Sequence, residues 1–499
     1  MSLSTVNTRA KLGLQAPLVS VEVHLSNGLP AFNIVGLPEA AVKESKDRVR
    51  SAIINSKFEF PNRRITVNLA PAELPKTGSR FDLAIAIGIL AASDQIPKEP
   101  LRDYEFIGEL ALSGEMRGVE AILPSAIACA AVDKKLIVSQ QNADEASLVE
   151  SITILAAKNL LQVSAHLFQS QLIKPWISIA TPKNSKHPEI SDVIGQKQAK
   201  RALEIAACGG HHMLLFGPPG TGKSMLAGRL AGLLPSMSNQ QALEVACIHS
   251  LAKKGLSKDL FERPFRLPHH SASAIAIVGG GSSPQPGEIS LAHQGVLFLD
   301  EFPEFQRSVL EVLREPLESG EINISRAAAQ ITFPAQFQLI AAMNPCPCGY
   351  LGSQRCNCSA EKIARYQGKI SGPILDRIDL HIPVNNIENK QLFETKKKPE
   401  GELNQQIRQR VSDARTLQMA RQGSVNARLD NQQLKKVCPL NQQQQDFLDR
   451  AINSYNLSTR SFHRLLKVAR SIADLAGKEF PDIPEYQEAL SYRNHFKAA

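Results

Sequence analysis

A glycine-rich stretch directly after an apolar run has the residue types and spacing needed to hold the phosphates of a nucleotide. Residues 212–216 form the apolar run, and the next eight match the pattern G-x-x-x-x-G-K-[ST]. In this pattern the curled backbone points its N–H groups at the phosphates, the lysine reaches the β- and γ-phosphates, and the hydroxyl ligates Mg²⁺. The predicted nucleotide-binding residues are Gly217, Pro218, Pro219, Gly220, Thr221, Gly222, Lys223 and Ser224.

A second apolar stretch, residues 295–299, ends in two carboxylates. Asp300 suits the Mg²⁺ shell, and Glu301 suits polarising the water that attacks the γ-phosphate. The alternative is a glycine-rich turn that happens to accompany a capped buried strand. Because both patterns occur in the right order, we predict a chain that binds and hydrolyses ATP with Mg²⁺.

Three later polar residues fit the same chemistry. Asn344 ends an expected strand over 337–343, where its amide would orient the attacking water. Arg377 lies at an expected helix end, from which a guanidinium could neutralise charge on a neighbouring subunit's nucleotide. Arg460 opens a helix near the C-terminus, where it would sense nucleotide state, with Arg464 as its substitute. Taken singly, Asn344 could be a turn residue and Arg377 a structural ion pair; the order of the set favours the functional interpretation.

At these residues the chain resembles AAA+ ATPases, and within them the magnesium-chelatase-like branch and the ComM/YifB family. The resemblance rests on residues 264–271, 279–281, 286–293 and 340–349, and it extends to residues 32–38 and 74–82. It implies a ring-forming motor, expected as a homohexamer. ComM proteins are understood as DNA helicases that drive branch migration during natural transformation, so the implied partners are single-stranded and branched DNA and recombination proteins.

The interval between Lys223 and Asp300 is longer than a minimal nucleotide-binding core needs, and residues 273–281 look like a loop insertion. A hairpin is expected from residues 321–326 and 330–333. In the family such insertions face the central pore, where a ring of Arg326 side chains would track the DNA backbone. The alternative is that Arg326 only solvates the tip of the hairpin.

Four cysteines lie within thirteen residues, as two C-x-C pairs: Cys346 with Cys348, and Cys356 with Cys358. Four thiolates can close a tetrahedral site suited to Zn²⁺. We therefore predict a structural zinc, with reduced thiols or a redox role as alternatives. The other four cysteines (Cys129, Cys208, Cys247, Cys438) lie in apolar helical contexts and are expected in the core.

The length of 499 residues predicts several domains. We expect an α/β domain over 1–168, a linker over 169–189, an α/β nucleotide-binding core over 190–390, and a helical lid over 391–499. The net charge of +9 favours a polyanionic partner only weakly, because the excess is spread along the chain. No apolar run is long enough for a membrane span, and the N-terminus lacks a signal peptide's apolar region, so we expect a cytoplasmic protein without a membrane partner.

The N-terminal region resembles the proteolytic domain of Lon at residues 76–80 and 106–118. Lon uses a serine activated by a lysine. Here Arg80 occupies the position of the serine, and residues 119–124, which should supply the lysine, contain none. The resemblance therefore implies a retained fold without proteolysis, used as a scaffold or DNA-binding collar.

Two other functions remain open from the sequence. A metal-chelatase motor subunit would share the ATPase core, but the extra N-terminal domain and the four-cysteine cluster count against it. A nucleotide-gated scaffold for recombination proteins would bind ATP without working as a motor.

Overall fold

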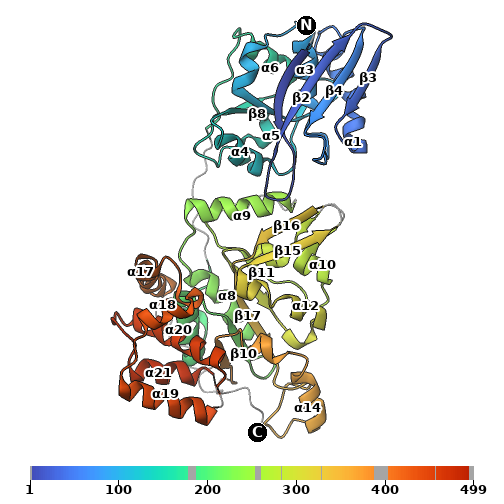
Figure 1. The fold of residues 1–499 in the computed structure, drawn as a ribbon. Helices are drawn as coiled ribbons and strands as arrows, with labels where there is room; N and C mark the ends of the chain where they lie inside the picture. Colours follow the sequence, from blue (N-terminus) through green and yellow to red (C-terminus); the bar gives the residue numbers. More distant parts are fainter. Residues whose placement is uncertain are drawn as a thin grey trace. The chain divides into compact units, whose positions relative to one another are not determined.

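The computed structural model describes residues 3–177, 187–252, 260–281, 284–326, 329–386, 403–455 and 457–493. The chain divides into two compact units: Met1–Lys183 with Ala242–Leu260, and Asn184–Gln241 with Phe261–Ala499 (Figure 1). Residues 178–186 of the predicted linker lie outside the described residues. Within the described ranges, no helix combines the length and the apolar character needed to cross a membrane.

The N-terminal unit is built on a mixed seven-stranded sheet in the order β3-β4-β2-β1-β5-β8-β9. Val19, Val21 and Val23 of β2 are fully buried and alternate with more exposed residues, as the sequence predicts for a strand with one face on a core. β1 and β2 pair antiparallel, whereas β5, β8 and β9 are parallel. The strands are β1 (Leu3–Arg9), β2 (Leu18–Ser26), β3 (Ala31–Val35), β4 (Arg64–Ala70), β5 (Tyr104–Ile107), β8 (Lys135–Ser139) and β9 (Ile154–Ala157), with a separate pair β6 (Glu109–Leu110) and β7 (Met116–Arg117).

Helix α3 is buried along its whole length, because every residue from Asp82 to Ala92 lies inside the unit. Residues 40–55 form two helices that meet at Glu44. A later segment completes this unit: Ala246 and Cys247 of α9 pack in one cluster with Ile122 and Leu123. The helices are α1 (Ala40–Lys43), α2 (Ser45–Asn55), α3 (Asp82–Ala92), η1 (Glu99–Asp103), α4 (Ile122–Ala130), α5 (Gln140–Ala146), α6 (Leu160–Leu167) and α9 (Asn239–Leu251).

The position expected for a Lon-type nucleophile holds a buried arginine. The Arg80 guanidinium donates hydrogen bonds to the carbonyl oxygens of Glu120 (3.0 Å) and Ala121 (3.3 Å). Burial lowers its pKa to about 10. The neighbouring Ser79 hydroxyl donates to the Glu109 carboxylate, an acceptor that cannot act as the lysine of a Ser–Lys pair.

The second unit contains a five-stranded parallel sheet in the order β11-β14-β17-β10-β18. Apart from Gln338 at the start of β17, the three central strands are apolar throughout, as expected for a parallel sheet covered on both faces. Because the strands are parallel, the residues that follow β10, β14 and β17 meet at one edge. The strands are β10 (Met213–Phe216), β11 (Phe265–Arg266), β14 (Val296–Leu299), β17 (Gln338–Met343) and β18 (Leu380–Pro383).

The predicted hairpin is present, with β15 (Glu321–Arg326) paired antiparallel to β16 (Ala329–Pro334). The stretch expected as a loop insertion, residues 273–281, instead holds helix α10 (Ala274–Val278), capped by the Ser273 hydroxyl, before β12 (Gly279–Gly280). Ile277 of α10 is fully buried, which explains why an apolar stretch folds here rather than staying irregular. β12 pairs with β13 (Gln285–Pro286).

Helices cover both faces of the sheet, and the C-terminal helical region shares its hydrophobic core (Figure 1). The four isolated cysteines are buried, as predicted. The remaining helices are η2 (Ile190–Asp192), α7 (Lys197–Gly209), α8 (Lys223–Leu233), α11 (Glu288–Leu291), η3 (Phe302–Glu304), α12 (Arg307–Val312), α13 (Pro316–Ser319), α14 (Ala360–Gln367), α15 (Gly372–Leu375), α17 (Asn404–Gln422), η4 (Asn426–Arg428), α18 (Asn431–Val437), α19 (Gln442–Tyr455), α20 (Thr459–Leu475) and α21 (Ile483–Ser491).

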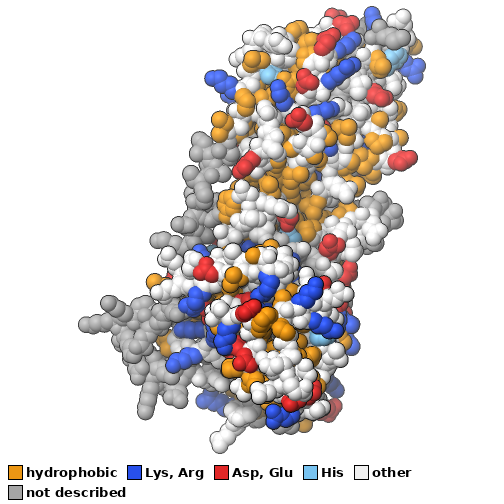
Figure 2. Space-filling view, turned by 60° about the vertical axis from the view of Figure 1, so that its left-hand side comes forward, with side chains coloured by type: hydrophobic (Ala, Val, Ile, Leu, Met, Phe, Trp, Pro, Cys, Tyr) orange, Lys and Arg blue, Asp and Glu red, His pale blue; other side chains and the backbone are white. Residues whose placement is uncertain are grey.

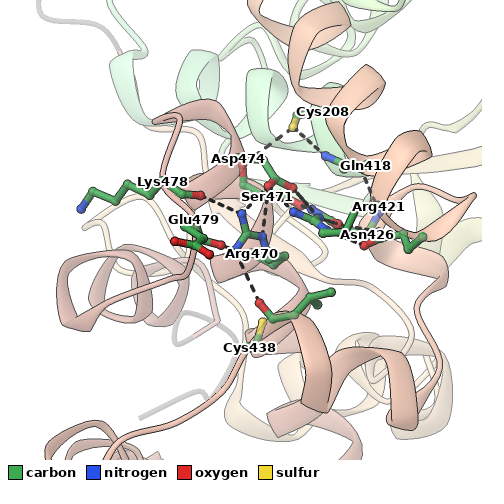
Figure 3. A network of polar contacts seen from close by, with 12 residues as sticks. Cys208, Gln418, Arg421, Asn426, Cys438, Arg470, Ser471, Asp474, Lys478 and Glu479 are labelled. Atoms are coloured by element: carbon green, nitrogen blue, oxygen red, sulfur yellow. Dashed lines mark hydrogen bonds and ion pairs between the residues drawn. The ribbon is translucent and has the colours of Figure 1, made fainter.

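A buried ionic network ties the C-terminal helices together (Figure 3). The Asp474 carboxylate accepts hydrogen bonds from Arg421 (2.8 and 3.0 Å), Arg470 (3.0 Å from Nε) and Asn426 (2.8 Å). Arg470 is 1% exposed and also donates to the carbonyl of Glu479 (2.5 Å). Burial alone would raise the pKa of Asp474, but the two arginines hold it below its usual value. The network therefore depends on an ionised Asp474.

Replacing Asp474 with asparagine should lower the free energy of unfolding by about 3–5 kcal/mol, because the buried Arg470 and the partly exposed Arg421 both lose their counter-charge. Denaturant unfolding measures this, with Asp449→Asn on the exposed face of α19 as the matched control. Because the folded-state pKa is depressed, the stabilisation should be complete above the unfolded pKa of about 4 and should disappear as the pH falls through the folded value. Equal stabilities of the two variants at neutral pH would contradict this role of Asp474.

Candidate nucleotide-binding site

The phosphate loop joins β10 to the N-terminus of α8, and its glycines are required by its geometry. A Cβ atom at Gly217 would lie 2.1 Å from the carbonyl oxygen of Val384, which directly follows the neighbouring strand β18. Gly220 and Gly222 have φ values of +78° and +87°, in the region that favours glycine. The loop is followed directly by α8, an eleven-residue helix whose free N–H groups and dipole favour an anion.

The Lys223 amine lies among polar atoms at the carboxyl edge of the sheet. It donates to the carbonyl oxygens of Gly217 (2.8 Å) and Pro218 (2.8 Å) and to Oδ1 of Asn344 (3.1 Å). Burial lowers the pKa of Lys223, and the nearby Asp300 carboxylate opposes that shift. The structure thus brings the predicted phosphate-binding lysine and the predicted water-orienting amide into direct contact.

Two of the predicted Mg²⁺ ligands are in contact. The Ser224 hydroxyl donates a hydrogen bond of 2.6 Å to Oδ2 of Asp300. A hydroxyl and a carboxylate at this distance fit the oxygen preference of Mg²⁺, which keeps waters and phosphate oxygens as its other ligands. The chemistry that the ion would supply is to bridge and neutralise the β- and γ-phosphates.

Glu301 adopts a left-handed conformation with φ = +51°, which is costly for a residue with a side chain. Its exposed carboxylate lies 3.1 Å from Nδ1 of His270. His270 and the Glu301 backbone therefore both restrain where the carboxylate points. His270 belongs to a stretch that carries the family resemblance, but the sequence did not indicate a role for it. Two helices and three strands, α10 to β14, lie between His270 and Glu301 along the chain.

The segment after Asn344 packs against the phosphate loop. Gly349 has φ = +85°, and a Cβ there would lie 2.6 Å from Cδ of Pro219. The Gln367 amide donates to the carbonyl of Pro345 (3.0 Å) and holds the start of this segment. The cysteine-containing segment therefore packs against the phosphate loop, and a change in its fold would alter the conformation of that loop.

The four predicted zinc ligands converge. Their Sγ atoms all lie within 4.8 Å of one another, although 10 residues separate Cys346 from Cys356. Three of the separations are 3.4 Å (Cys346–Cys348), 3.9 Å (Cys346–Cys356) and 3.7 Å (Cys348–Cys356). A tetrahedral site with Zn–S bonds of about 2.3 Å places its sulfur atoms about 3.8 Å apart. The residues therefore fit a Zn²⁺ ion, which would close the segment as a structural crosslink.

Purified protein should carry about one Zn²⁺ per chain, and Cys356→Ser should lose it. Because the segment contacts Pro219, the variant should also bind ATP more weakly than the wild type does. Metal analysis by mass spectrometry and ATP titration measure the two effects, with Cys438→Ser, in the buried core, as the control that retains the metal. Gently purified wild-type protein without zinc would refute the assignment.

The structure groups Arg377 and Arg460 with each other rather than with Lys223. Both ion-pair with the Glu318 carboxylate, Arg377 at 2.8 Å. Arg377 precedes β18, which runs parallel to β10, so it lies at the amino edge of the sheet, whereas the phosphate loop lies at the carboxyl edge. Arg464 lies in the same place, with hydrogen bonds of 2.7 Å to the Arg377 carbonyl and to Asp379.

Glu318 links the two arginines and was not singled out from the sequence. Burial alone would raise the pKa of its carboxyl, but Arg377 and Arg460 keep it below the usual value. The Arg377 side chain is only 6% exposed, compared with 47% for Arg460. The sequence does not indicate this contact, because the β15–β16 hairpin and the central strand β17 lie between Glu318 and the two arginines along the chain.

Comparison with known protein families extends these observations to nearly the whole chain. Three models of magnesium chelatase subunit ChlI match: subunit ChlI of Mg-chelatase over residues 21–142, subunit ChlI over 189–392, and its C-terminal region over 401–493. Competence protein ComM of Haemophilus influenzae is 51% identical over 501 residues, which cover 99% of this chain and 98% of that protein. The chain belongs to the ComM/YifB family of magnesium-chelatase-like AAA+ proteins.

Other relatives support this membership. YifB of Escherichia coli K12 is 50% identical over 499 residues, covering 99% of this chain and 97% of that protein. In contrast, the magnesium-chelatase 38 kDa subunit of Cereibacter sphaeroides is 30% identical over 176 residues, only 31% of this chain and 52% of that subunit. The family is one of ATPases, consistent with the phosphate loop and the carboxylates beside it.

Proposed function

We propose that the chain is an ATP-driven, ring-forming DNA motor of the cytoplasm that promotes branch migration and homologous recombination of incoming DNA. One observation supports the proposal: the side chains predicted to bind and hydrolyse ATP lie together at one edge of the sheet, and two clustered arginines lie at the other. A chain built this way needs a second copy to complete its reaction. The similarity to a competence protein supports DNA as the substrate.

In this proposal each side chain has a separate task. Lys223 and the phosphate-loop N–H groups bind the β- and γ-phosphates, and Ser224 and Asp300 hold Mg²⁺. Glu301, oriented by His270, removes a proton from the attacking water, and Asn344 fixes the position of that water. The direct contact between Asn344 and Lys223 supports this role, because the lysine is the residue proposed to bind the γ-phosphate.

Arg377 and Arg460 would act on the nucleotide of the neighbouring subunit. The support is their position at the amino edge of the sheet, together with their shared ion pair to Glu318. On assembly, the phosphates of the neighbour would compete with Glu318 for both guanidinium groups. A homohexameric ring repeats this contact at each interface.

The DNA contact is proposed at the β15–β16 hairpin. The hairpin buries Ile322 and Phe333 and extends to Arg326, whose side chain lies outside the described residues. On the face shown in Figure 2, Lys and Arg side chains are interspersed with Asp, Glu and uncharged residues. The distribution of charge on that face therefore does not indicate where DNA binds. A ring of hairpins, each carrying Arg326, would be a more specific DNA-binding surface.

Replacing Arg326 with alanine should leave basal ATP hydrolysis nearly unchanged but weaken DNA binding and DNA-stimulated hydrolysis several-fold. Removal of a phosphate-binding cation should also reduce the slope of log affinity against log salt by about one for each phosphate that the protein no longer neutralises. Fluorescence anisotropy with single-stranded DNA at several salt concentrations measures this, with Arg365→Ala on α14 as the control. If the DNA affinity, its salt dependence and the DNA stimulation of ATP hydrolysis are all unchanged, the hairpin has only a structural role.

A metal-chelatase motor subunit is the second candidate, because all three matching family models are of a magnesium-chelatase subunit. The four-cysteine segment and the whole-length similarity to ComM favour the DNA motor. A purely structural scaffold is disfavoured by the catalytic geometry, since scaffolding does not need the Ser224–Asp300 pair or a restrained Glu301. ATP hydrolysis stimulated by DNA, but not by a porphyrin, would separate the candidates.

A further inference from the structure

A cavity of about 900 Å³ lies at the amino edge of the second unit's sheet, away from the phosphate loop. Its lining includes His212, Gly295 and Gln338, which precede or begin the strands β10, β14 and β17. The opposite wall comes from α17, η4 and α20 of the helical region, which Figure 1 shows beside the sheet. A volume of this size is at the upper end of the range of about 300–1,000 Å³ found for small-ligand sites.

The cavity is strongly basic. Its lining cations are Arg263, Arg415, Arg428, Arg460, Arg464 and Lys467. Among the described lining residues, the carboxylates are Glu318 and Asp379, and both are already in ion pairs: Glu318 with Arg460, and Asp379 with Arg464. Four cations therefore remain without a carboxylate in the lining that pairs with them.

Those four side chains donate hydrogen bonds to neutral oxygens. Arg263 donates to the Gln294 carbonyl (2.6 Å), and Arg415 to the Ala207 carbonyl (2.8 Å). Arg428 donates to the amide oxygen of Gln336 (2.6 Å), and Lys467 to the Ala427 carbonyl (3.1 Å). These bonds fix the orientation of the cations, but the neutral oxygens supply no counter-charge.

Burial disfavours the charged form of two of these arginines. Burial, with a contribution from Arg415, lowers the pKa of Arg263 to about 9. Burial, opposed by the Cys208 thiol and reinforced by Arg428, lowers the pKa of Arg415 to about 10. An anion between these groups would remove the repulsion, and its binding would be favoured by the low local dielectric.

We propose that this cavity is a second oligophosphate-binding site, which takes a small ligand with several phosphate groups, such as a nucleotide, independently of the phosphate loop. Arg263, Arg415, Arg428 and Lys467 would bind the phosphates. The amide side chains of Gln241 and Gln294, which also line the cavity, would accept or donate hydrogen bonds to the rest of the ligand. The volume of about 900 Å³ suits a nucleotide rather than a DNA duplex.

The site can be tested with inorganic tripolyphosphate as the probe. Isothermal titration of full-length Lys223→Ala protein, in which the phosphate loop is disabled, should show one tripolyphosphate bound per chain, and wild-type protein should show two. Adding Lys467→Gln or Arg428→Gln to Lys223→Ala should weaken binding at least tenfold. The matched controls, Lys362→Gln and Arg365→Gln on the exposed face of α14, should change it less than twofold.

A further variant covers the case in which Arg428 or Lys467 is needed for folding. His463→Glu introduces a negative charge at a half-buried position of the lining and should weaken tripolyphosphate binding to the same extent while thermal unfolding stays cooperative. Failure of Lys223→Ala protein to bind the probe, or equal weakening by the α14 controls, would overturn the proposal. Displacement of tripolyphosphate by a single-stranded oligonucleotide would also overturn it, because the cavity would then be a DNA groove.

Discussion

Glu301→Gln should bind ATP with nearly wild-type affinity and hydrolyse it about 100- to 10,000-fold more slowly, the usual contribution of a positioned general base. The amide keeps the shape of the side chain and its place beside His270, but it cannot accept the proton of the attacking water. Lys223, the phosphate-loop N–H groups and the Mg²⁺ ligands, which supply the affinity, are unchanged.

Single-turnover hydrolysis and a nucleotide-binding titration separate the two effects. Glu304→Gln is the matched control, because Glu304 lies three residues further along and forms only a surface ion pair with Lys369 (3.0 Å). That variant should retain full turnover. A Glu301→Gln protein with near-normal hydrolysis would show that another group accepts the proton.

Arg377→Ala should bind ATP but lose about 1,000-fold or more in turnover, the effect expected when an arginine that stabilises the transferring phosphoryl group is removed. The loss should be repaired in mixtures with Glu301→Gln. At hybrid interfaces a chain with an intact Glu301 meets a neighbour with an intact Arg377, so those sites regain activity. Arg460→Ala should be complemented in the same way, because Arg460 shares Glu318 with Arg377.

The control for this mixing experiment is a chain carrying both Glu301→Gln and Arg377→Ala, which should not rescue either single variant. Subunit exchange has to be verified by mixing differently labelled wild-type rings. If mixtures in which subunits exchange stay inactive, Arg377 acts within its own chain or only structurally. Its role would then be the buried ion pair with Glu318.

The features that the sequence predicted well are those encoded by local pattern. Apolar strands, the phosphate loop and the hairpin each have a signature within about ten residues, and the structure has them at nearly the expected bounds. The convergence of Asp300 and Asn344 on Lys223 also followed from sequence, because the carboxyl ends of neighbouring parallel strands meet. Residues 273–281 were misjudged because glycine at 279–281 obscured the preceding turn of helix, whose stability comes from the burial of Ile277.

What sequence did not reveal depends on contacts between distant segments. The Glu318 contact with Arg377 and Arg460 joins three elements with no shared spacing. The packing of α9 into the N-terminal unit also joins distant segments. Its apolar residues lie within 190–390 of the sequence, the range predicted for the nucleotide-binding core, and nothing in them indicates that they pack elsewhere. The basic cavity is also assembled from residues dispersed between positions 263 and 467.

The most direct test of the proposed function is ATP-dependent branch migration of a synthetic four-way DNA junction by the purified full-length protein. We predict conversion of the junction to duplex products with wild-type protein and ATP, and none with Glu301→Gln or without Mg²⁺. A wild-type protein that hydrolyses ATP but leaves junctions and forked DNA unchanged, with no stimulation of hydrolysis by DNA, would contradict the assignment as a DNA motor.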